Sequence, residues 1–162
     1  VTEMECKIYA DLYGLDTISL RYFNVYSEDQ CTSGAYATAI AHWKYSIKNN
    51  ITPYITGDGK QRRDMVHVND IVSANIFAMN HKDNFAGESF DVGTGDNISL
   101  NEIKEIIQQY HDVEFEYLDA RPGEVETTRA RTGDLKSLGW EAQIKITDGI
   151  KNCFRFVKLE GE

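Results

Sequence analysis

Two arginines and an asparagine stand where they could hold a phosphorylated ligand. Arg63 lies in the run Gly57-Asp58-Gly59-Lys60-Gln61-Arg62-Arg63-Asp64, and Arg121 begins the run Arg121-Pro122-Gly123-Glu124. Because a guanidinium group donates two parallel hydrogen bonds to a phosphate, two arginines from separate loops could bind one diphosphate. Asn24 ends a predicted strand, beyond which ligands of open α/β sheets collect. Taken singly, a solvated arginine or a strand-terminating asparagine is the commoner outcome.

The composition is that of a globular protein with an acidic surface. The chain has 162 residues, of which 41% are hydrophobic and 27% charged, and its net charge is −9. This length fits one domain with a core, residues 1–162. The negative charge argues against a nucleic-acid partner. No apolar run reaches the ~20 residues that span a bilayer, and the start has no secretory signal, so a cytoplasmic protein with no membrane contact is expected.

The cysteines and histidines show no ligand spacing. Cys6, Cys31 and Cys153 are scattered and odd in number, and no two cysteines are separated by only two residues. Reduced thiols are therefore expected, without a disulfide or a metal site. His67 lies within an apolar strand and is interpreted as a core histidine rather than as a general base.

Hydrophobic spacing predicts alternating short helices and strands, an α/β or α+β fold with a small sheet. Helices are expected at 4–13, 35–48, 69–80, 100–110, 134–138 and about 148–157, and strands at 17–22, 54–56, 63–68, 89–92 and 113–118. Asn69-Asp70 and Thr147 or Asp148 are candidate helix caps. Ser99 and Glu102 match a capping box.

Two tempting motifs are rejected from the residues themselves. Gly93-Thr94-Gly95 lacks the third glycine of a dinucleotide-binding loop, since Ile98 stands at that position. Arg62 adjoins Arg63, but strand alternation turns the two side chains to opposite faces, so at most one should face a ligand.

The motifs in combination resemble the extended short-chain dehydrogenases/reductases, the family of NAD-dependent nucleotide-sugar epimerases and dehydratases. The resemblance rests on Arg21-Tyr22-Phe23-Asn24, on Gly57 to Asp64, on the Phe90 to Gly95 turn and on Arg121 to Glu124. It covers Thr2 to about Ile150. It implies the carboxyl-terminal, substrate-binding half of a Rossmann-type α/β enzyme, with a small mixed sheet and without the dinucleotide half. The UDP-glucose 4-epimerase type is the nearest in character, and dehydratases and decarboxylases share the architecture.

The resemblance also implies roles for individual residues. Tyr22 and Phe23 would face the NAD cofactor, and Asn24 would contact the sugar nucleotide. The remaining assignments are Arg63 and Arg121 to the phosphates, Glu124, where the family commonly has Asp, to the ribose, and Tyr54 and Thr56 to the nucleobase. Packing within the sheet is an alternative role for Tyr54 and Thr56. The expected ligand is a nucleotide-sugar, most simply a UDP-sugar.

The first residues depart from the family pattern. The family's catalytic pair is Tyr-x-x-x-Lys, and a helix with its own sequence pattern follows this pair. When Thr2 to Tyr9 are matched to that helix, Glu3 falls at the lysine position and the tyrosine would lie before Val1. A carboxylate there would disfavour the phenolate that catalysis needs. Tyr26-Ser27-Glu28 also replaces the usual Tyr-Gly-Pro. The chain alone is therefore expected neither to catalyse nor to bind NAD.

Two rival interpretations remain, a non-catalytic nucleotide-sugar-binding module and a fragment cut from a longer chain without activity of its own. The absence of an initiator Met favours the second. The helix at 4–13 carries an apolar face, formed by Met4, Ile8 and Leu12, which the resemblance assigns to a homodimer interface.

Overall fold

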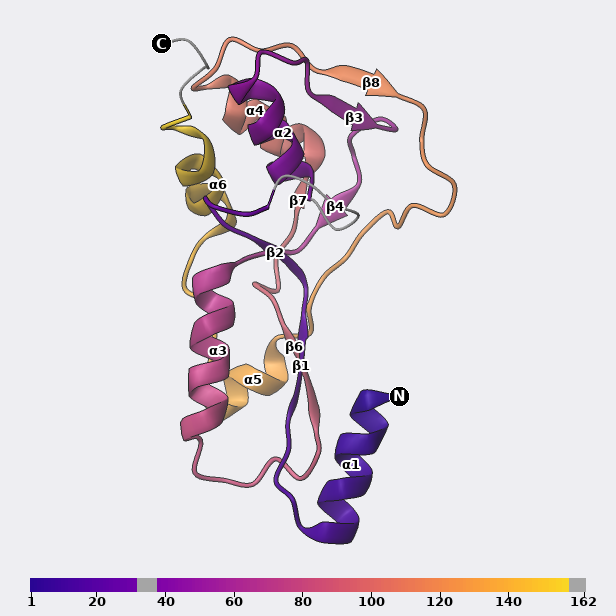
Figure 1. Ribbon diagram of the computed structural model, residues 1–162, viewed down its shortest axis with the longest axis vertical. Coiled ribbons are helices and arrows are strands. Elements are labelled where there is room, and N and C mark those ends of the chain that lie inside the picture. The colour runs from indigo at the N-terminus through magenta and orange to yellow at the C-terminus, as the bar shows by residue number, and fades with distance from the viewer. Residues whose placement is uncertain (32–37, 158–162) are drawn as a thin grey trace.

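The computed structural model describes residues 1–31 and 38–157. Within them the helices are α1 (Thr2–Tyr13), α2 (Ala39–Lys48), α3 (Val68–Asn80), α4 (Leu100–Gln108), α5 (Gly133–Leu138) and α6 (Ile146–Phe154). The strands are β1 (Ser19–Tyr22), β2 (Asn24–Tyr26), β3 (Tyr54–Thr56), β4 (Arg62–Arg63), β5 (Met65–His67), β6 (Ser89–Val92), β7 (Ile98–Ser99) and β8 (Glu116–Leu118). The elements form an elongated molecule with α1 near one end (Figure 1).

The strands form four two-stranded pairs. β1 pairs with β6, β2 with β5 and β3 with β8, all parallel, whereas β4 and β7 are antiparallel. The strands of each parallel pair are far apart in the sequence, and helices lie between them in chain order, as is usual for crossover connections. The fold is therefore α/β, as the sequence predicts, with short strand pairs in place of one continuous sheet.

The polypeptide changes partners at Asn24, which begins β2 rather than ending a strand. The Phe23 amide still donates to the Val92 carbonyl in β6, whereas the Asn24 amide donates to the Asp64 carbonyl beside β5. Asp64 likewise separates β4 from β5, so the continuous strand predicted at 63–68 is wrong. The strand predicted at 113–118 is limited to β8, because Val113 and Phe115 instead pack against the core.

Several helix boundaries differ from the prediction. His67 caps α3, because its Nδ1 accepts a hydrogen bond from the Asn69 amide, so the predicted Asn69-Asp70 cap is wrong. Neither Thr147 nor Asp148 caps α6, which follows Lys145 without a side-chain cap and ends at Phe154. The capping box of Ser99 and Glu102 is confirmed. Thr38 caps α2, and the predicted helical residues 35–37 lie outside the described residues.

Two hydrophobic clusters divide the molecule. One cluster lies between α2, α4 and α6 and includes Trp43, Ile103 and Phe154. We call these three helices, together with β3, β4, β7 and β8, the cavity region. The other lies between α3, α5 and β6 and includes Phe90 and Trp140; we call these elements, with α1 and β1, the strand-pair region. In Figure 1 the cavity region occupies the upper part and the strand-pair region the lower part.

Asp64 connects, through its hydrogen bonds, the segments that meet between the two regions. Its side chain is fully buried. The carboxylate accepts hydrogen bonds from the amides of Thr94, Gly95 and Ala130 and from the Thr94 hydroxyl, at 2.8 to 3.0 Å. Because a buried carboxylate requires such partners, Asp64 fixes the turn after β6 and the segment before α5 relative to β4 and β5.

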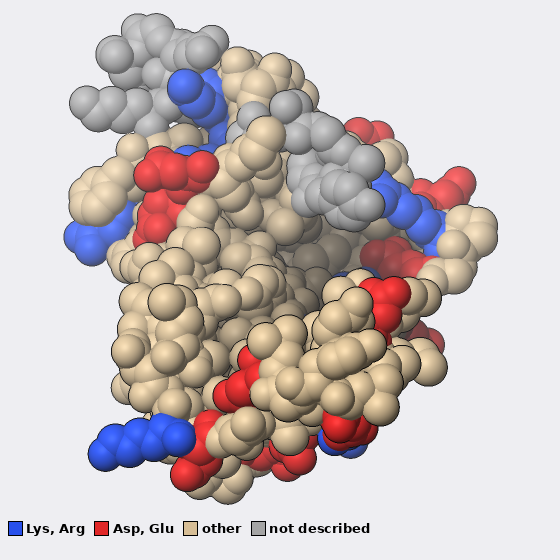
Figure 2. Space-filling view, turned by 60° about the horizontal axis from the view of Figure 1, so that its bottom comes forward, with Lys and Arg blue, Asp and Glu red and all other residues tan. Residues whose placement is uncertain are grey.

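α1 has no buried residue, although it is the second-longest of the described helices. Its apolar side chains are exposed, Met4 and Leu12 each to 70%, which confirms the open apolar face expected at 4–13. None of the helices in the described ranges combines the length and apolar character needed to cross a membrane. The face drawn in Figure 2 mixes acidic with basic side chains around a central hollow lined mostly by neutral ones, without a continuous basic surface among its described residues.

Candidate functional site

A cavity of about 510 Å³ opens in the cavity region, between α2, β3 and the loop at 119–127. All six residues predicted to contact a substrate line it, namely Asn24, Tyr54, Thr56, Arg63, Arg121 and Glu124. The remaining lining residues are Thr38, Ala39, Ile40, His42, Trp43, Ile55, Met65, Leu100 and Ile103. The structure thus brings both arginines to one concave surface, and the same cavity is lined by cationic, amide and aromatic groups.

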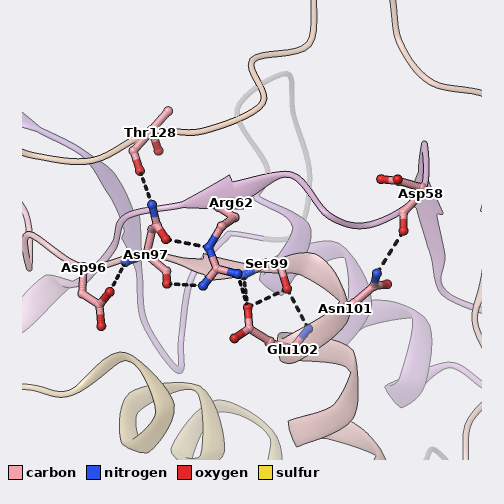
Figure 3. Close-up of polar contacts among 8 residues, drawn as sticks. All are labelled: Asp58, Arg62, Asp96, Asn97, Ser99, Asn101, Glu102 and Thr128. Carbon is pink, nitrogen blue, oxygen red and sulfur yellow. Dashed lines mark hydrogen bonds and ion pairs between the residues drawn. The ribbon is translucent and has the colours of Figure 1, made fainter.

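Strand alternation separates Arg62 from Arg63, as predicted. Figure 3 shows the Arg62 guanidinium bound to Asn97 and Glu102: Nε donates to Asn97 Oδ1 at 2.6 Å, and Nη1 to Glu102 Oε2 at 2.7 Å. The same Glu102 carboxylate closes the capping box with Ser99. Arg62 therefore holds the start of α4, and of the two only Arg63 lines the cavity.

Glu124 holds Arg63 loosely. Arg63 Nη2 lies 3.5 Å from Glu124 Oε1, and the Arg63 side chain is 18% exposed. The carboxylate also accepts long hydrogen bonds, both 3.4 Å, from the Thr56 hydroxyl and from the Gln61 side chain. Charge-assisted hydrogen bonds are ordinarily shorter, about 2.7–2.9 Å, so Arg63 is free to exchange this carboxylate for an anion of better geometry.

Asn24 has one atom left for a ligand. Its Nδ2 donates to the Asp64 carbonyl at 2.9 Å and to the Thr128 hydroxyl at 3.1 Å. Both amide hydrogens are then used within the protein, so the carbonyl oxygen is the group that can accept a hydrogen bond in the cavity.

His42 is, with Thr38, a polar residue of the cavity that the sequence analysis did not assign to the site. It lies on α2 with its ring 4.5 Å from that of Tyr54, edge to face. Burial, and secondly the nearby Arg121 guanidinium, lower the pKa of the His42 imidazole. Ile40, Trp43 and Ile47 form the buried face of α2, and their helical spacing gives no sign that His42 reaches a cavity between this helix and a distant strand.

Tyr22 and Phe23 lie away from the cavity. The Tyr22 side chain is exposed and its hydroxyl donates to Asn75 Oδ1 at 3.0 Å. Phe23 packs against the cluster of the strand-pair region. Their predicted contact with NAD stays a prediction for the complete enzyme.

The Gly93-Thr94-Gly95 turn is not arranged as a phosphate-binding loop for a dinucleotide. The Gly93-Thr94-Gly95 turn follows β6 but leads into β7 rather than into a helix. The amides of Thr94 and Gly95, which would have to face a phosphate, donate to the Asp64 carboxylate. The turn is structural, as predicted, and no NAD chemistry can be assigned to it.

Glu3 forms an ion pair with Arg21 of β1. Arg21 Nε donates to Glu3 Oε1 at 2.7 Å, and Nη2 reaches Oε2. The Arg21 guanidinium holds the pKa of the Glu3 carboxyl below its usual range, and Glu3 in turn raises the pKa of Arg21. Glu3 is therefore an ionised partner of the Arg21 side chain.

His67 is bonded at both ring nitrogens, to Glu28 Oε2 at 3.0 Å and to the Asn69 amide at 3.2 Å. It is buried, which confirms the core histidine predicted from the sequence. Over residues 1–31 and 38–157, no group of three or more His, Cys, Asp or Glu side chains is arranged to hold a metal ion.

Comparisons with known proteins agree with this arrangement. The family model for the NAD dependent epimerase/dehydratase family matches residues 1–93. A putative UDP-glucose 4-epimerase of Methanocaldococcus jannaschii is 37% identical over 98% of the chain and 51% of its own length. A UDP-N-acetyl-alpha-D-glucosaminuronate decarboxylase of Bacillus cytotoxicus is 36% identical over 66% of the chain and 32% of its own length.

The fold likewise matches a solved structure. The UDP-glucose 4-epimerase of Thermotoga maritima, crystallised with UDP-glucose, superposes with a TM-score of 0.86 at 33% identity, over 96% of this chain and 50% of that one. The chain thus spans about half the length of the epimerases that it matches. On the family match and the extent of these similarities, the chain belongs to the NAD-dependent epimerase/dehydratase family.

Proposed function

We propose that the cavity binds a nucleotide-sugar, and that the chain is the substrate-binding portion of an NAD-dependent nucleotide-sugar epimerase of the UDP-sugar 4-epimerase type. One observation carries the proposal: Arg63 and Arg121, from distant parts of the sequence, line a single cavity together with Asn24 and Tyr54. A diphosphate needs two such cations against the background of a net charge of −9.

The roles follow from the groups that the cavity presents. Arg63 and Arg121 bind the diphosphate, and Asn24 accepts a hydrogen bond through its free carbonyl oxygen to orient the substrate. Glu124 releases Arg63 to the phosphate and turns to the ribose hydroxyls. Tyr54 and Thr56 contact the nucleobase. In the complete enzyme, bound NAD would supply the reversible hydride exchange that an epimerase needs, in which the hydride taken from the sugar C4 returns to the opposite face.

Ligand titration tests the proposal directly. UDP-glucose should bind the chain weakly in isothermal titration calorimetry. Replacing Arg63 or Arg121 by alanine should weaken binding by ~1.5–3 kcal/mol, because a charged phosphate loses its partner. Arg131→Ala is the matched control, since Arg131 is exposed and does not line the cavity. Equal affinity in the wild type and both cavity variants would contradict the assignment.

A second candidate, a nucleotide-sugar-binding module without catalysis, is favoured by Glu3. At the position that the resemblance gives to a catalytic lysine, this chain has a carboxylate paired with Arg21. We expect the 162-residue chain to show neither turnover of UDP-glucose nor binding of NAD. Epimerisation by the purified chain, followed by product chromatography, would exclude this candidate.

A dehydratase or decarboxylase of the same family is the remaining alternative, and the similarity to the Bacillus cytotoxicus decarboxylase supports it. Product analysis with the full-length protein would distinguish the three reactions.

We also propose a cytoplasmic homodimer in which the open face of α1 packs on its copy. Gel filtration of the chain should show self-association that Ile8→Lys reduces, because Ile8 is 49% exposed on that face.

A further inference from the structure

His42 has a buried nitrogen without a partner. Its Nδ1 atom is inaccessible to solvent, and it forms no hydrogen bond with any residue of 1–31 or 38–157. The same side chain lines the cavity. A buried polar atom without a partner destabilises the folded protein, so its retention needs a reason.

Tyr26 provides an internal comparison. Its hydroxyl is also buried and unpaired within the described residues, but Tyr26 is only 1% exposed, lies in the core and does not line the cavity. A β-carbon added at Gly149 would lie 1.9 Å from that hydroxyl, so Gly149 packs directly against it, away from the lining of the cavity. His42 lines the cavity itself, so a rotation of its imidazole as a ligand enters would bring Nδ1 from its solvent-inaccessible position to a partner there.

We propose that His42 is a specificity-determining residue, whose Nδ1 atom hydrogen-bonds the nucleobase of the bound nucleotide while its ring and that of Tyr54 form the wall of the base site. This inference rests on the proposed function, because it requires a nucleotide in the cavity.

The surroundings favour the base over the diphosphate as the partner of His42. The lowered pKa leaves the imidazole neutral at pH 7, so it offers a hydrogen bond rather than a charge. Ile40, Trp43 and Ile55 also line the cavity and are buried, which suits a flat, uncharged ring. The phosphates already have Arg63 and Arg121.

Three variants isolate this contact, with UDP and inorganic pyrophosphate as probes in titration calorimetry on the 162-residue chain. His42→Phe keeps an aromatic ring and removes Nδ1. It should raise the Kd for UDP about 3- to 10-fold and leave the Kd for pyrophosphate unchanged. His42→Asn should recover part of the loss, because its amide places a polar atom near the position of Nδ1. Arg63→Ala should weaken both probes.

The melting temperature separates ligand binding from a structural role. Because His42→Phe removes an unpaired buried nitrogen, the free protein should melt at the same temperature or higher. A lower melting temperature, an unchanged Kd for UDP, or an equal loss for both probes would each overturn the inference while leaving the Arg63 result intact. If the wild type binds neither probe, the proposed function fails and the role of His42 fails with it.

Discussion

The two regions of the molecule use helices of the same kind in opposite ways. In the cavity region α4 buries Ile103, Ile106 and Ile107 against α6, and α2 buries Trp43. In the strand-pair region α1 has apolar side chains at similar spacing, but buries none of them. It is held instead by polar contacts, such as the Glu3–Arg21 pair and the Lys7 ammonium on the Ala86 carbonyl.

This difference indicates that the stability of the chain depends on its two cores rather than on α1. The cavity region has its own core, and the cavity wall is part of that core, because Trp43 and Ile103 belong to both. The strand-pair region is covered by α3 and α5, while α1 leaves an apolar surface available for a partner. The ligand site in the cavity region therefore does not depend on tight packing of α1.

The largest expected effect comes from breaking the connection between the regions. Asp64→Ala removes the acceptor of the Thr94, Gly95 and Ala130 amides, of which the Ala130 amide is buried and the other two are partly buried. We expect a loss of ~3–5 kcal/mol in the free energy of unfolding, measured in urea. Asp112→Ala, at an exposed position, should change it by no more than about 0.5 kcal/mol. Similar values for both would show that Asp64 does not couple the regions.

The next effect compares equivalent isoleucines. Ile107 in α4 is fully buried, whereas Ile8 in α1 is 49% exposed. Ile107→Ala should cost ~2–5 kcal/mol, because it removes transfer free energy and leaves a cavity. Ile8→Ala should remain within about 0.5 kcal/mol in the monomer. Thermal unfolding at low protein concentration measures both, and a large loss for Ile8→Ala would mean that α1 is more tightly packed than its exposure indicates.

A smaller effect separates the neighbouring arginines. Arg62→Ala should lower the free energy of unfolding by ~1–3 kcal/mol, since Asn97 and Glu102 lose a charged partner at the start of α4. Arg63→Ala, whose contact with Glu124 is long, should hardly change stability but should weaken UDP-glucose binding. Arg62→Lys keeps the charge without the fork and serves as control. The reverse pattern, with Arg62 controlling binding, would contradict the site.

The smallest effect is a pH dependence at Glu102. The Ser99 hydroxyl and amide and the Arg62 guanidinium lower the pKa of this carboxyl in the folded chain. Its contribution to stability is therefore present above the ordinary pKa of 4.5 and is lost as the pH falls through the lower folded value. Because the side chain is 48% exposed, the change should stay below about 1 kcal/mol. Glu102→Gln should flatten the dependence of the free energy of unfolding on pH below 4.5, and an unchanged slope would contradict the assignment.

Several features followed from local sequence because local chemistry decides them. The Ser99–Glu102 capping box, the stop of α1 at Gly14 and the turn with positive φ at Gly57 and Gly59 each depend on a few adjacent residues. Alternation along a strand placed Arg62 and Arg63 on opposite sides, and the family resemblance pointed to six of the residues that line the cavity.

The remaining features could not be predicted from local sequence, because they depend on which segments of the chain meet in the folded protein. Asn24 begins a strand since the chain changes its partner from β6 to β5 there, and Asp64 interrupts a strand pattern to collect amides from two distant loops. Apolar residues recur with helical spacing in both α1 and α4, but this spacing does not predict which helix packs against another element. His42 became a site candidate for the same reason. Its buried nitrogen lies near Tyr54 and Arg121, which are distant from it in the sequence, and only the fold brings the three residues together.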